Sequence, residues 1–296
     1  MIVRDRPTRL DLAFAVRGSI VPAIAPRLVL LMLVSAAMVL AHDNLPGFPE
    51  LGGTGFTVFG IALSLFLGFR NNAAYGRWWE ARKLWGGLLA DLRSFARELE
   101  LFESDTGKRH EMLRLVLAFI HLHRANLRGL TADEQAMDRG TAFMDTPHPP
   151  DAPLNQIAEI IADGTRSARI DGFGAKALGE RLASIALQQA GCERIATTPP
   201  PYVYSLLIYR TTYLYCLLLP LALIGPAGWL TPIFVGIVAY VFLGLAEVTE
   251  DLAHPFGTTP NALPLDAICR AAEISLAPHL GEEAPEPMKA KNFYLS

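Results

Sequence analysis

Histidine side chains are the first candidates for chemistry in this 296-residue chain. His121 and His123 stand two residues apart, which places them on opposite sides of a helix, so they cannot share one metal ion. No companion ligand stands at a spacing that zinc sites use. The pattern therefore favours solvated or core histidines over a metal site.

The cysteines and the short motifs give no stronger case for catalysis. Cys192, Cys216 and Cys269 lie far apart in the sequence and form neither a disulfide framework nor a zinc spacing. The chain contains no G-x-S-x-G, no P-loop and no G-x-G-x-x-G followed by a helix. We predict a protein that is not an enzyme and that needs neither a cofactor nor a bound metal.

Four apolar stretches are the main organising feature, at residues 28–41, 56–69, 205–224 and 229–246. A helix needs about 20 mostly apolar residues to cross a bilayer, so the last two stretches are long enough and the first two are short. Residues 20–24 and 52–55 can lengthen the short ones. A signal peptide is the alternative for the first stretch, but its charged leader of 27 residues would be unusually long.

The basic residues predict how these stretches are oriented. None of the 26 Lys and Arg residues lies in the connector 42–55 or in the turn 225–228, whereas 17 lie between Arg70 and Arg194. Lys and Arg accumulate on the cytoplasmic side of membrane proteins. Both termini and a large middle domain are therefore predicted to be cytoplasmic.

Composition fits a chain that is half membrane-embedded, with 51% hydrophobic and 19% charged residues. A net charge of −3 gives no case for nucleic-acid binding. Apolar residues recur at three and four residues in the middle domain, which predicts helices, so the expected fold is all-α with four transmembrane helices. The predicted parts are an N-terminal cytoplasmic segment, a first transmembrane hairpin, a helical cytoplasmic domain, a second transmembrane hairpin and a C-terminal cytoplasmic segment, at residues 1–27, 28–69, 70–201, 202–246 and 247–296.

Two separated motifs carry a family resemblance. Residues 60–69, Gly-Ile-Ala-Leu-Ser-Leu-Phe-Leu-Gly-Phe, lead into residues 70–82, which contain the run Arg77-Trp78-Trp79. The second motif is Asp-Leu-Ala-His-Pro-Phe-Gly at residues 251–257, followed by Leu-Pro-Leu-Asp at residues 263–266. Here the chain closely resembles the bestrophin family of pentameric ion channels, over roughly residues 1–280. The resemblance implies a five-fold symmetric homopentamer in a lipid bilayer.

Ile61, Leu65 and Phe69 are spaced at four and stack along one side of their helix. The opposite side is also apolar, so periodicity alone leaves a buried core stripe as an alternative. The resemblance implies that these three positions form a hydrophobic pore neck of three stacked rings. Narrow apolar rings can block ions, which would lose their hydration there without gaining a ligand.

One departure from the family concerns calcium. Eukaryotic bestrophins follow Pro-Phe-Gly with acidic residues that form a calcium clasp, but no carboxylate lies between Gly257 and Leu265 here. We therefore expect a prokaryotic-type member in a bacterial inner membrane, without calcium gating. The resemblance also implies a second, cytoplasmic constriction between Ile170 and Gly179, at an unknown register.

The permeating ion stays open between chloride and the monovalent cations sodium and potassium. The family is known for anions, yet some bacterial homologues pass cations. Glu247, Glu250 and Asp251 would attract cations if they faced the pore, but paired or solvated carboxylates are the favoured interpretation. A non-conducting membrane scaffold is a further alternative. A transporter would be expected to show an internal repeat, which the sequence lacks.

Arg210 lies about 12 Å into the third apolar stretch, where an unpaired charge is costly. If the third and fourth stretches form an antiparallel hairpin, Glu247 lies about one turn from the level of Arg210. An intramembrane ion pair between Arg210 and Glu247 is expected, with Glu250 as the alternative partner.

Overall fold

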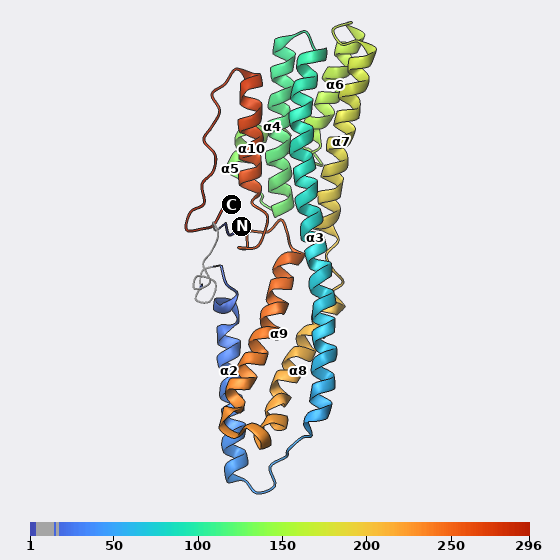
Figure 1. Cartoon of the computed structure of the whole chain (residues 1–296). Helices are drawn as coiled ribbons and strands as arrows, with labels where there is room; N and C mark the ends of the chain where they lie inside the picture. The colour runs from blue at the N-terminus through green and yellow to red at the C-terminus, as the bar shows by residue number, and fades with distance from the viewer. Residues whose placement is uncertain (4–14, 16–17) are drawn as a thin grey trace. The chain divides into compact units, whose positions relative to one another are not determined.

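The computed structural model describes residues 1–3, 15 and 18–296 (Figure 1). The described part is helical apart from turns and two isolated β-bridges, which confirms the all-α prediction. Residues 4–14 and 16–17 of the predicted N-terminal segment, residues 1–27, lie outside the described residues, and they include Arg4, Arg6, Arg9 and Arg17. The described residues form two compact units, and α3 (Gly53–Phe102) contributes to both.

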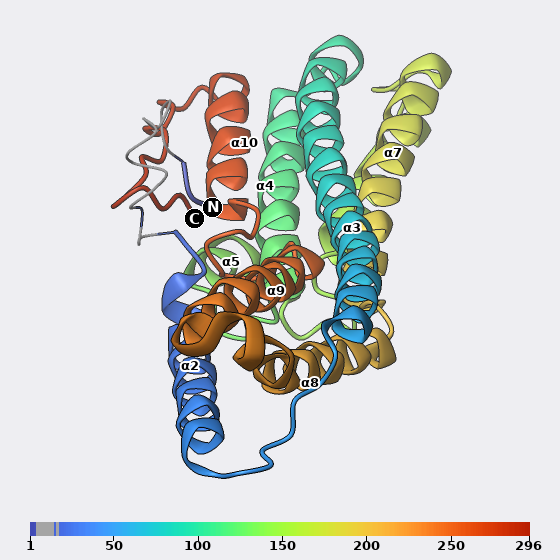
Figure 2. The same ribbon diagram turned by 60° about the horizontal axis from the view of Figure 1, so that its bottom comes forward.

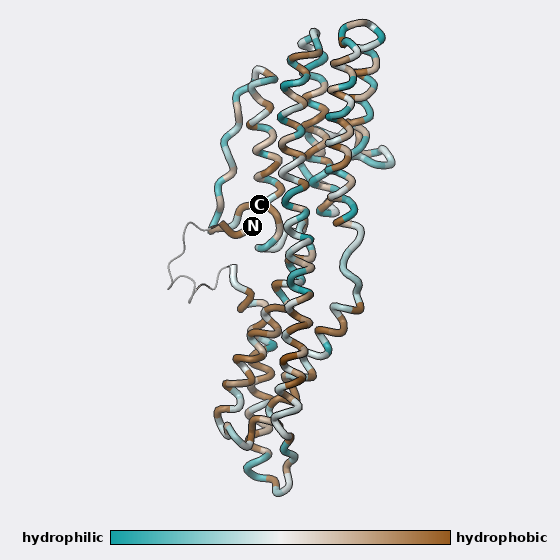
Figure 3. Tube along the Cα trace, turned by 45° about the vertical axis from the view of Figure 1, so that its right-hand side comes forward, coloured by the Kyte–Doolittle hydropathy of each residue, from teal (hydrophilic) through white to brown (hydrophobic). Residues whose placement is uncertain are grey.

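The apolar unit contains α2 (Val21–Asn44), α3 up to Trp78, α8 (Tyr202–Ala227), a 3-10 turn (Gly228–Leu230) and α9 (Thr231–Ala253). Within it α9 packs against both α2 and α8 (Figures 1 and 2). The shared core is almost entirely aliphatic and includes Ile24, Leu67, Val235 and Ala239. Hydrophobic colouring runs along all four of these helical segments (Figure 3).

The first two membrane segments are longer than the apolar stretches that predicted them. α2 begins at Val21, with a proline in its first turn where the missing N–H costs nothing, and runs for 24 residues. α3 runs for 50 residues and contains no Pro, and it continues through Gly76, Gly86 and Gly87. Three segments are long and apolar enough to cross a membrane among the described residues: Val21–Asn44, Gly53–Phe102 and Tyr202–Ala253, the last of which holds both α8 and α9.

The polar unit contains α3 from Trp79 onward, α4 (Thr106–Arg128), α5 (Glu134–Gly140), a 3-10 turn (Thr141–Phe143), α6 (Ala152–Arg166), α7 (Gly172–Thr197) and α10 (Leu265–Leu280). α4 lies at its centre and packs against α5, α6, α7 and α10. The carboxylate of Asp105 accepts hydrogen bonds from the first turn of α4, and Gly129 ends the helix in the left-handed conformation.

Small residues and one charged cluster fix α7 against α3. A Cβ atom on Gly174 would lie 2.7 Å from Cβ of Phe102, so only glycine permits this approach. Further along, Arg181 donates to Asp91 at 2.8 Å and to Glu98 at 2.8 Å. These contacts are structural, since each charge already has its partner.

The two histidines of α4 are core residues that face different neighbours. His121 lies 2.9 Å from Glu273 of α10, and Arg139 and Arg270 also reach that carboxylate. Burial alone would raise the pKa of Glu273, but the hydrogen bond from His121 and the nearby positive charges outweigh it and hold the pKa below its usual value. His121 and His123 therefore face different neighbours, as their spacing of two residues along a helix predicts.

His123 is fully buried between aromatic rings. Its ring stacks on Phe119 and Trp85, with both centroid distances at 5.6 Å, and neither ring nitrogen has a hydrogen-bond partner among the described residues. Burial, together with the charge of His148, lowers the pKa of His123 to about 3. The imidazole is therefore neutral at every pH near 7.

We expect His123→Phe to make the protein less sensitive to acid. The pKa of His123 is about 3 in the folded chain against an ordinary value of 6.5, so the unfolded chain binds the proton first as the pH falls. This contribution to stability is complete above pH 6.5 and is lost as the pH falls toward 3. Between pH 7 and about pH 4.5, the free energy of unfolding should fall by roughly 2 to 3 kcal/mol less in the variant than in the parent.

The measurement is unfolding of the purified, detergent-solubilised protein at neutral and acid pH. His110→Phe places the same ring at a half-buried position of the same helix and serves as the control. An unchanged acid sensitivity in His123→Phe would show that His123 is not the group responsible.

Candidate functional site

The predicted neck residues lie on the exposed side of α3 in the isolated chain. Ile61, Leu65 and Phe69 are 58%, 56% and 70% exposed, respectively. Leu63 and Leu67 are buried and belong to the core of the apolar unit. The structure thus separates two faces that the sequence pattern could not distinguish.

Helix geometry places Leu65 opposite that buried face. At about 100° per residue, Leu63 and Leu67 each lie about 160° around the helix from Leu65, on either side. Val58 and Phe66 are also exposed, so exposure alone does not single out the three predicted positions. The arrangement removes the core-stripe alternative for Ile61, Leu65 and Phe69, because none of the three packs into the core of its own chain.

Two contacts hold α3 in this rotation, one on each side of Leu65. A Cβ atom on Gly60 would lie 2.6 Å from the hydroxyl oxygen of Tyr215, so glycine allows α3 to approach α8 closely. After the apolar run, Arg70 donates to the carboxylate of Glu250 at 2.6 Å and to the hydroxyl of Ser205 at 2.8 Å. Arg70 thereby connects α3 to both α8 and α9.

The predicted pair between Arg210 and Glu247 is not formed in this protomer. Glu247 instead accepts a hydrogen bond from Arg27 of α2 at 3.1 Å, and Glu250 is bound by Arg70. Arg210 is exposed, and it makes no ion pair with either acid. α8 instead turns its Tyr209 side toward the pocket that Glu247 and Glu250 line, and spacing along the sequence does not determine this rotation.

The expected range for a cytoplasmic constriction contains one prominent exposed apolar side chain. Ile170 is buried, and its Cδ1 atom packs where a Cβ on Gly164 would lie, so it cannot project from the surface. Phe173, in the first turn of α7, is 83% exposed. The carboxylate of Asp171 caps this turn through the amide of Gly174 at 2.6 Å.

The turn that follows α9 is held by neutral groups. The carbonyl of Thr258 accepts a hydrogen bond from the hydroxyl of Tyr294, and the carbonyl of Pro260 accepts one from the amide of Ile2. Beyond the turn, Asp266 lies 2.9 Å from Arg124 and 2.7 Å from Arg128. Burial alone would raise the pKa of Asp266. The hydrogen bond from the Ser296 hydroxyl and the charges of the two arginines outweigh burial, so the pKa lies below its usual value and the carboxylate stays ionised.

Comparison with known proteins gives a consistent result over nearly the whole chain. Residues 1–278 match the family described as Bacterial/Fungal Bestrophin protein. A voltage-dependent anion channel-forming protein of Mesorhizobium japonicum is 42% identical over 305 aligned residues, covering 100% of this chain and 97% of the relative. The voltage-dependent anion channel-forming protein YneE of Escherichia coli is 39% identical over 98% of this chain and 97% of its own length.

A solved structure agrees with these relatives. The crystal structure of a bacterial bestrophin homolog from Klebsiella pneumoniae is 31% identical, with a TM-score of 0.83, and the match covers 88% of this chain and 99% of that one. The family match and the two relatives support the same assignment independently of the fold. The chain belongs to the bacterial and fungal bestrophin family.

Proposed function

We propose that this protein is a passive anion channel, built from five copies around a pore in the bacterial inner membrane, with both termini cytoplasmic. The observation that carries the proposal is the exposed apolar face of α3, in a family whose relatives are named for forming anion channels. In a bilayer, exposed apolar side chains such as Ile61, Leu65 and Phe69 face either lipid or a neighbouring subunit, and the family resemblance favours the subunit. Five copies would bring these side chains together around one axis.

In this arrangement the first, third and fourth membrane helices, α2, α8 and α9, need not line the pore. α2, α8 and α9 pack together in one core, to which α3 contributes Leu63 and Leu67, and the face of α3 with Ile61, Leu65 and Phe69 lies outside that core. Three stacked apolar rings, one each from Ile61, Leu65 and Phe69, would form the neck and hold the pore closed by excluding water. Phe173, the exposed side chain in the range expected for the cytoplasmic constriction, is our candidate for that second narrowing.

Apolar rings favour neither anions nor cations, so the fixed charges of the protein determine which ion is preferred. Glu247 and Glu250, which would attract cations if unpaired, each lie within ion-pair distance of an arginine. Their negative charges are therefore neutralised locally, which weakens the case for a cation channel of the same fold. The names of the relatives point the same way.

We also propose that calcium does not gate the channel. The turn over residues 258–262 offers only Thr258, Thr259 and Asn261 as polar side chains, and three of its carbonyls already accept hydrogen bonds. Calcium sites of sensor affinity use six to eight oxygen ligands with several carboxylates. The ion pairs of Asp266 keep the nearest downstream carboxylate engaged with Arg124 and Arg128.

Anion selectivity is tested with the purified protein in a planar bilayer under a chloride salt gradient. The reversal potential should approach the equilibrium potential of the anion. A reversal near the equilibrium potential of the cation would identify the alternative cation channel. A bilayer that contains assembled protein and carries no current would support the scaffold alternative.

The same recordings test the calcium proposal. Addition of a calcium chelator should leave the current unchanged, since the turn lacks the charge to hold the ion at micromolar concentration. A current that disappears with chelator and returns with micromolar calcium would contradict the proposal. Magnesium added at the same concentration controls for a general effect of divalent ions on the lipid.

Shortening the neck side chains should increase conduction. Ile61→Ala, Leu65→Ala and Phe69→Ala each remove apolar bulk where water exclusion sets the barrier, so each should raise conductance or open probability by roughly twofold or more. The anion preference should shift little, because the removed side chains carry no charge. The measurement is single-channel recording, with assembly checked by gel filtration.

Two control variants separate the neck from other effects. Phe66→Ala removes a phenylalanine side chain, as Phe69→Ala does, but from an exposed position on the flank of α3. It should not raise conduction. Leu63→Ala creates a cavity in the core and should cost about 2 to 5 kcal/mol of stability without opening the pore. A triple neck variant that assembles and conducts no better than the parent would rule out the neck.

A further inference from the structure

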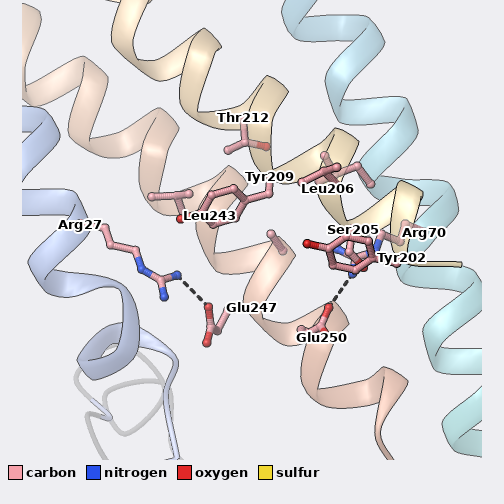
Figure 4. Close-up of a pocket in the computed structure, with 12 residues that line it drawn as sticks. Arg27, Arg70, Tyr202, Ser205, Leu206, Tyr209, Thr212, Leu243, Glu247 and Glu250 are labelled. Atoms are coloured by element: carbon pink, nitrogen blue, oxygen red, sulfur yellow. Dashed lines mark hydrogen bonds and ion pairs between the residues drawn. The ribbon is translucent and has the colours of Figure 1, made fainter. Parts of the chain in front are cut away.

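A pocket of about 510 Å³ lies among the four helices of the apolar unit, and its role is not explained by ion conduction (Figure 4). We call it the interface pocket. Its walls come from the first turns of α8, the last turns of α9 and one arginine each from α2 and α3. This volume falls in the range of sites that hold small organic ligands.

The charged side chains around the interface pocket are two arginines and two glutamates, so their formal charges sum to zero. Arg27 enters from α2 and Arg70 from α3 on opposite sides, while Glu247 and Glu250 lie between them on one face of α9 (Figure 4). Each acid already pairs with one arginine, at 3.1 Å and 2.6 Å. An anion alone would meet the carboxylates and a cation alone would meet the arginines, whereas a zwitterion can oppose both.

The arginines can keep their carboxylates and still bind a ligand. A guanidinium carries five N–H donors, so one ion pair leaves donors to spare. Arg70 also holds the hydroxyl of Ser205 at 2.8 Å, which presents a second polar group beside it. This corner of the interface pocket suits a phosphate oxygen, and the space between Glu247 and Glu250 suits an ammonium group.

A second, independent observation lies deeper in the interface pocket. Thr212 lines it and is fully buried, and its hydroxyl has no hydrogen-bond partner among the described residues. The neighbouring Thr211 satisfies its own hydroxyl within the helix, by donating to the carbonyl of Leu207 at 2.8 Å. A buried hydroxyl without a partner costs stability, so the position of Thr212 points to an acceptor atom supplied by a ligand.

The depth of the interface pocket favours a lipid over a free solute. Tyr202 and Thr212 are ten residues apart on α8, which corresponds to about 15 Å along the helix axis. The polar layer on one side of a bilayer is only about 6 Å thick, so the inner end reaches the level of the acyl chains. Leu206 and Leu243 supply apolar walls, and the exposed Tyr202 and Tyr209 suit a membrane interface.

We propose that the interface pocket binds a phospholipid whose headgroup pairs a primary ammonium with a phosphate. The ammonium lies between Glu247 and Glu250, and the phosphate lies against Arg70 and Ser205. An ester carbonyl of the same lipid accepts the hydrogen bond of Thr212. Free phosphoethanolamine has the same ammonium and phosphate but no ester carbonyl. A contact between the ligand and Thr212 therefore distinguishes the phospholipid from the free headgroup.

Native mass spectrometry of the detergent-solubilised protein tests this with short-chain lipids. Dihexanoyl phosphatidylethanolamine should bind roughly 10-fold more tightly than the phosphatidylcholine and phosphatidylglycerol of the same chain length. The ammonium of phosphatidylcholine is fully methylated and has no N–H donors, and the glycerol headgroup of phosphatidylglycerol has no positive charge. Glu247→Gln should reduce the preference for the ethanolamine headgroup over the glycerol headgroup.

A matched pair of variants tests the deep contact. Thr212→Val preserves shape and removes the hydroxyl, so it should weaken binding of the ethanolamine lipid roughly 2- to 10-fold. Thr211→Val makes the same change one residue away, outside the interface pocket, and should have no effect. Neither variant should alter the binding of free phosphoethanolamine, because that molecule has no ester carbonyl to accept a hydrogen bond from Thr212.

Each contrary result overturns the proposal. Equal binding of the three lipids would remove the zwitterion argument. Free phosphoethanolamine that binds as tightly as the lipid would assign the interface pocket to a soluble zwitterion. A Thr212→Val variant that loses its oligomeric state, with lipid binding unchanged, would show that the neighbouring subunit fills the site.

Discussion

Arg70 makes the interaction on which the orientation of the predicted neck depends. It directly follows Phe69 in the sequence, and its guanidinium binds Glu250 of α9 and Ser205 of α8. Its side chain is only 12% exposed, so an alternative position would leave a largely desolvated charge without a partner. The close approach of Gly60 to Tyr215 restrains the same helix ten residues earlier. Between these two points α3 has little freedom to rotate, and Leu65 faces away from the core.

The paired carboxylates explain how an apolar helix bundle tolerates four charged side chains. An unpaired charge near the hydrocarbon region is costly, but Glu247 and Glu250 each meet an arginine from a different helix. The pairs are partly exposed, so their direct contribution to stability is small. Their larger effect is on arrangement, because they connect α2 and α3 to the same two turns of α9. That convergence also creates the interface pocket.

The sequence predicted those features that depend on the residues of a single helix, such as its apolar length. Apolar length predicted segments long enough to cross a membrane. The turn predicted at residues 225–228 comes slightly later, because α8 continues to Ala227 and the α-helix is interrupted at Gly228. The helix ends were less predictable, because α2 continues through polar residues to Asn44 and α3 continues past Arg70. In both cases the apolar run ends before the helical hydrogen bonding does.

Partners between helices were the part that sequence spacing did not reveal. The position of Arg210 within an apolar stretch predicted an acidic partner, but pairing also depends on rotation about the helix axis, which one sequence does not fix. Arg27 of α2 pairs with Glu247 instead. The buried cluster of Glu273 with His121, Arg139 and Arg270 was missed for the same reason, since its members come from three helices. In both clusters each acid is held by arginine or histidine, so neither leaves a free negative charge to determine which ion passes.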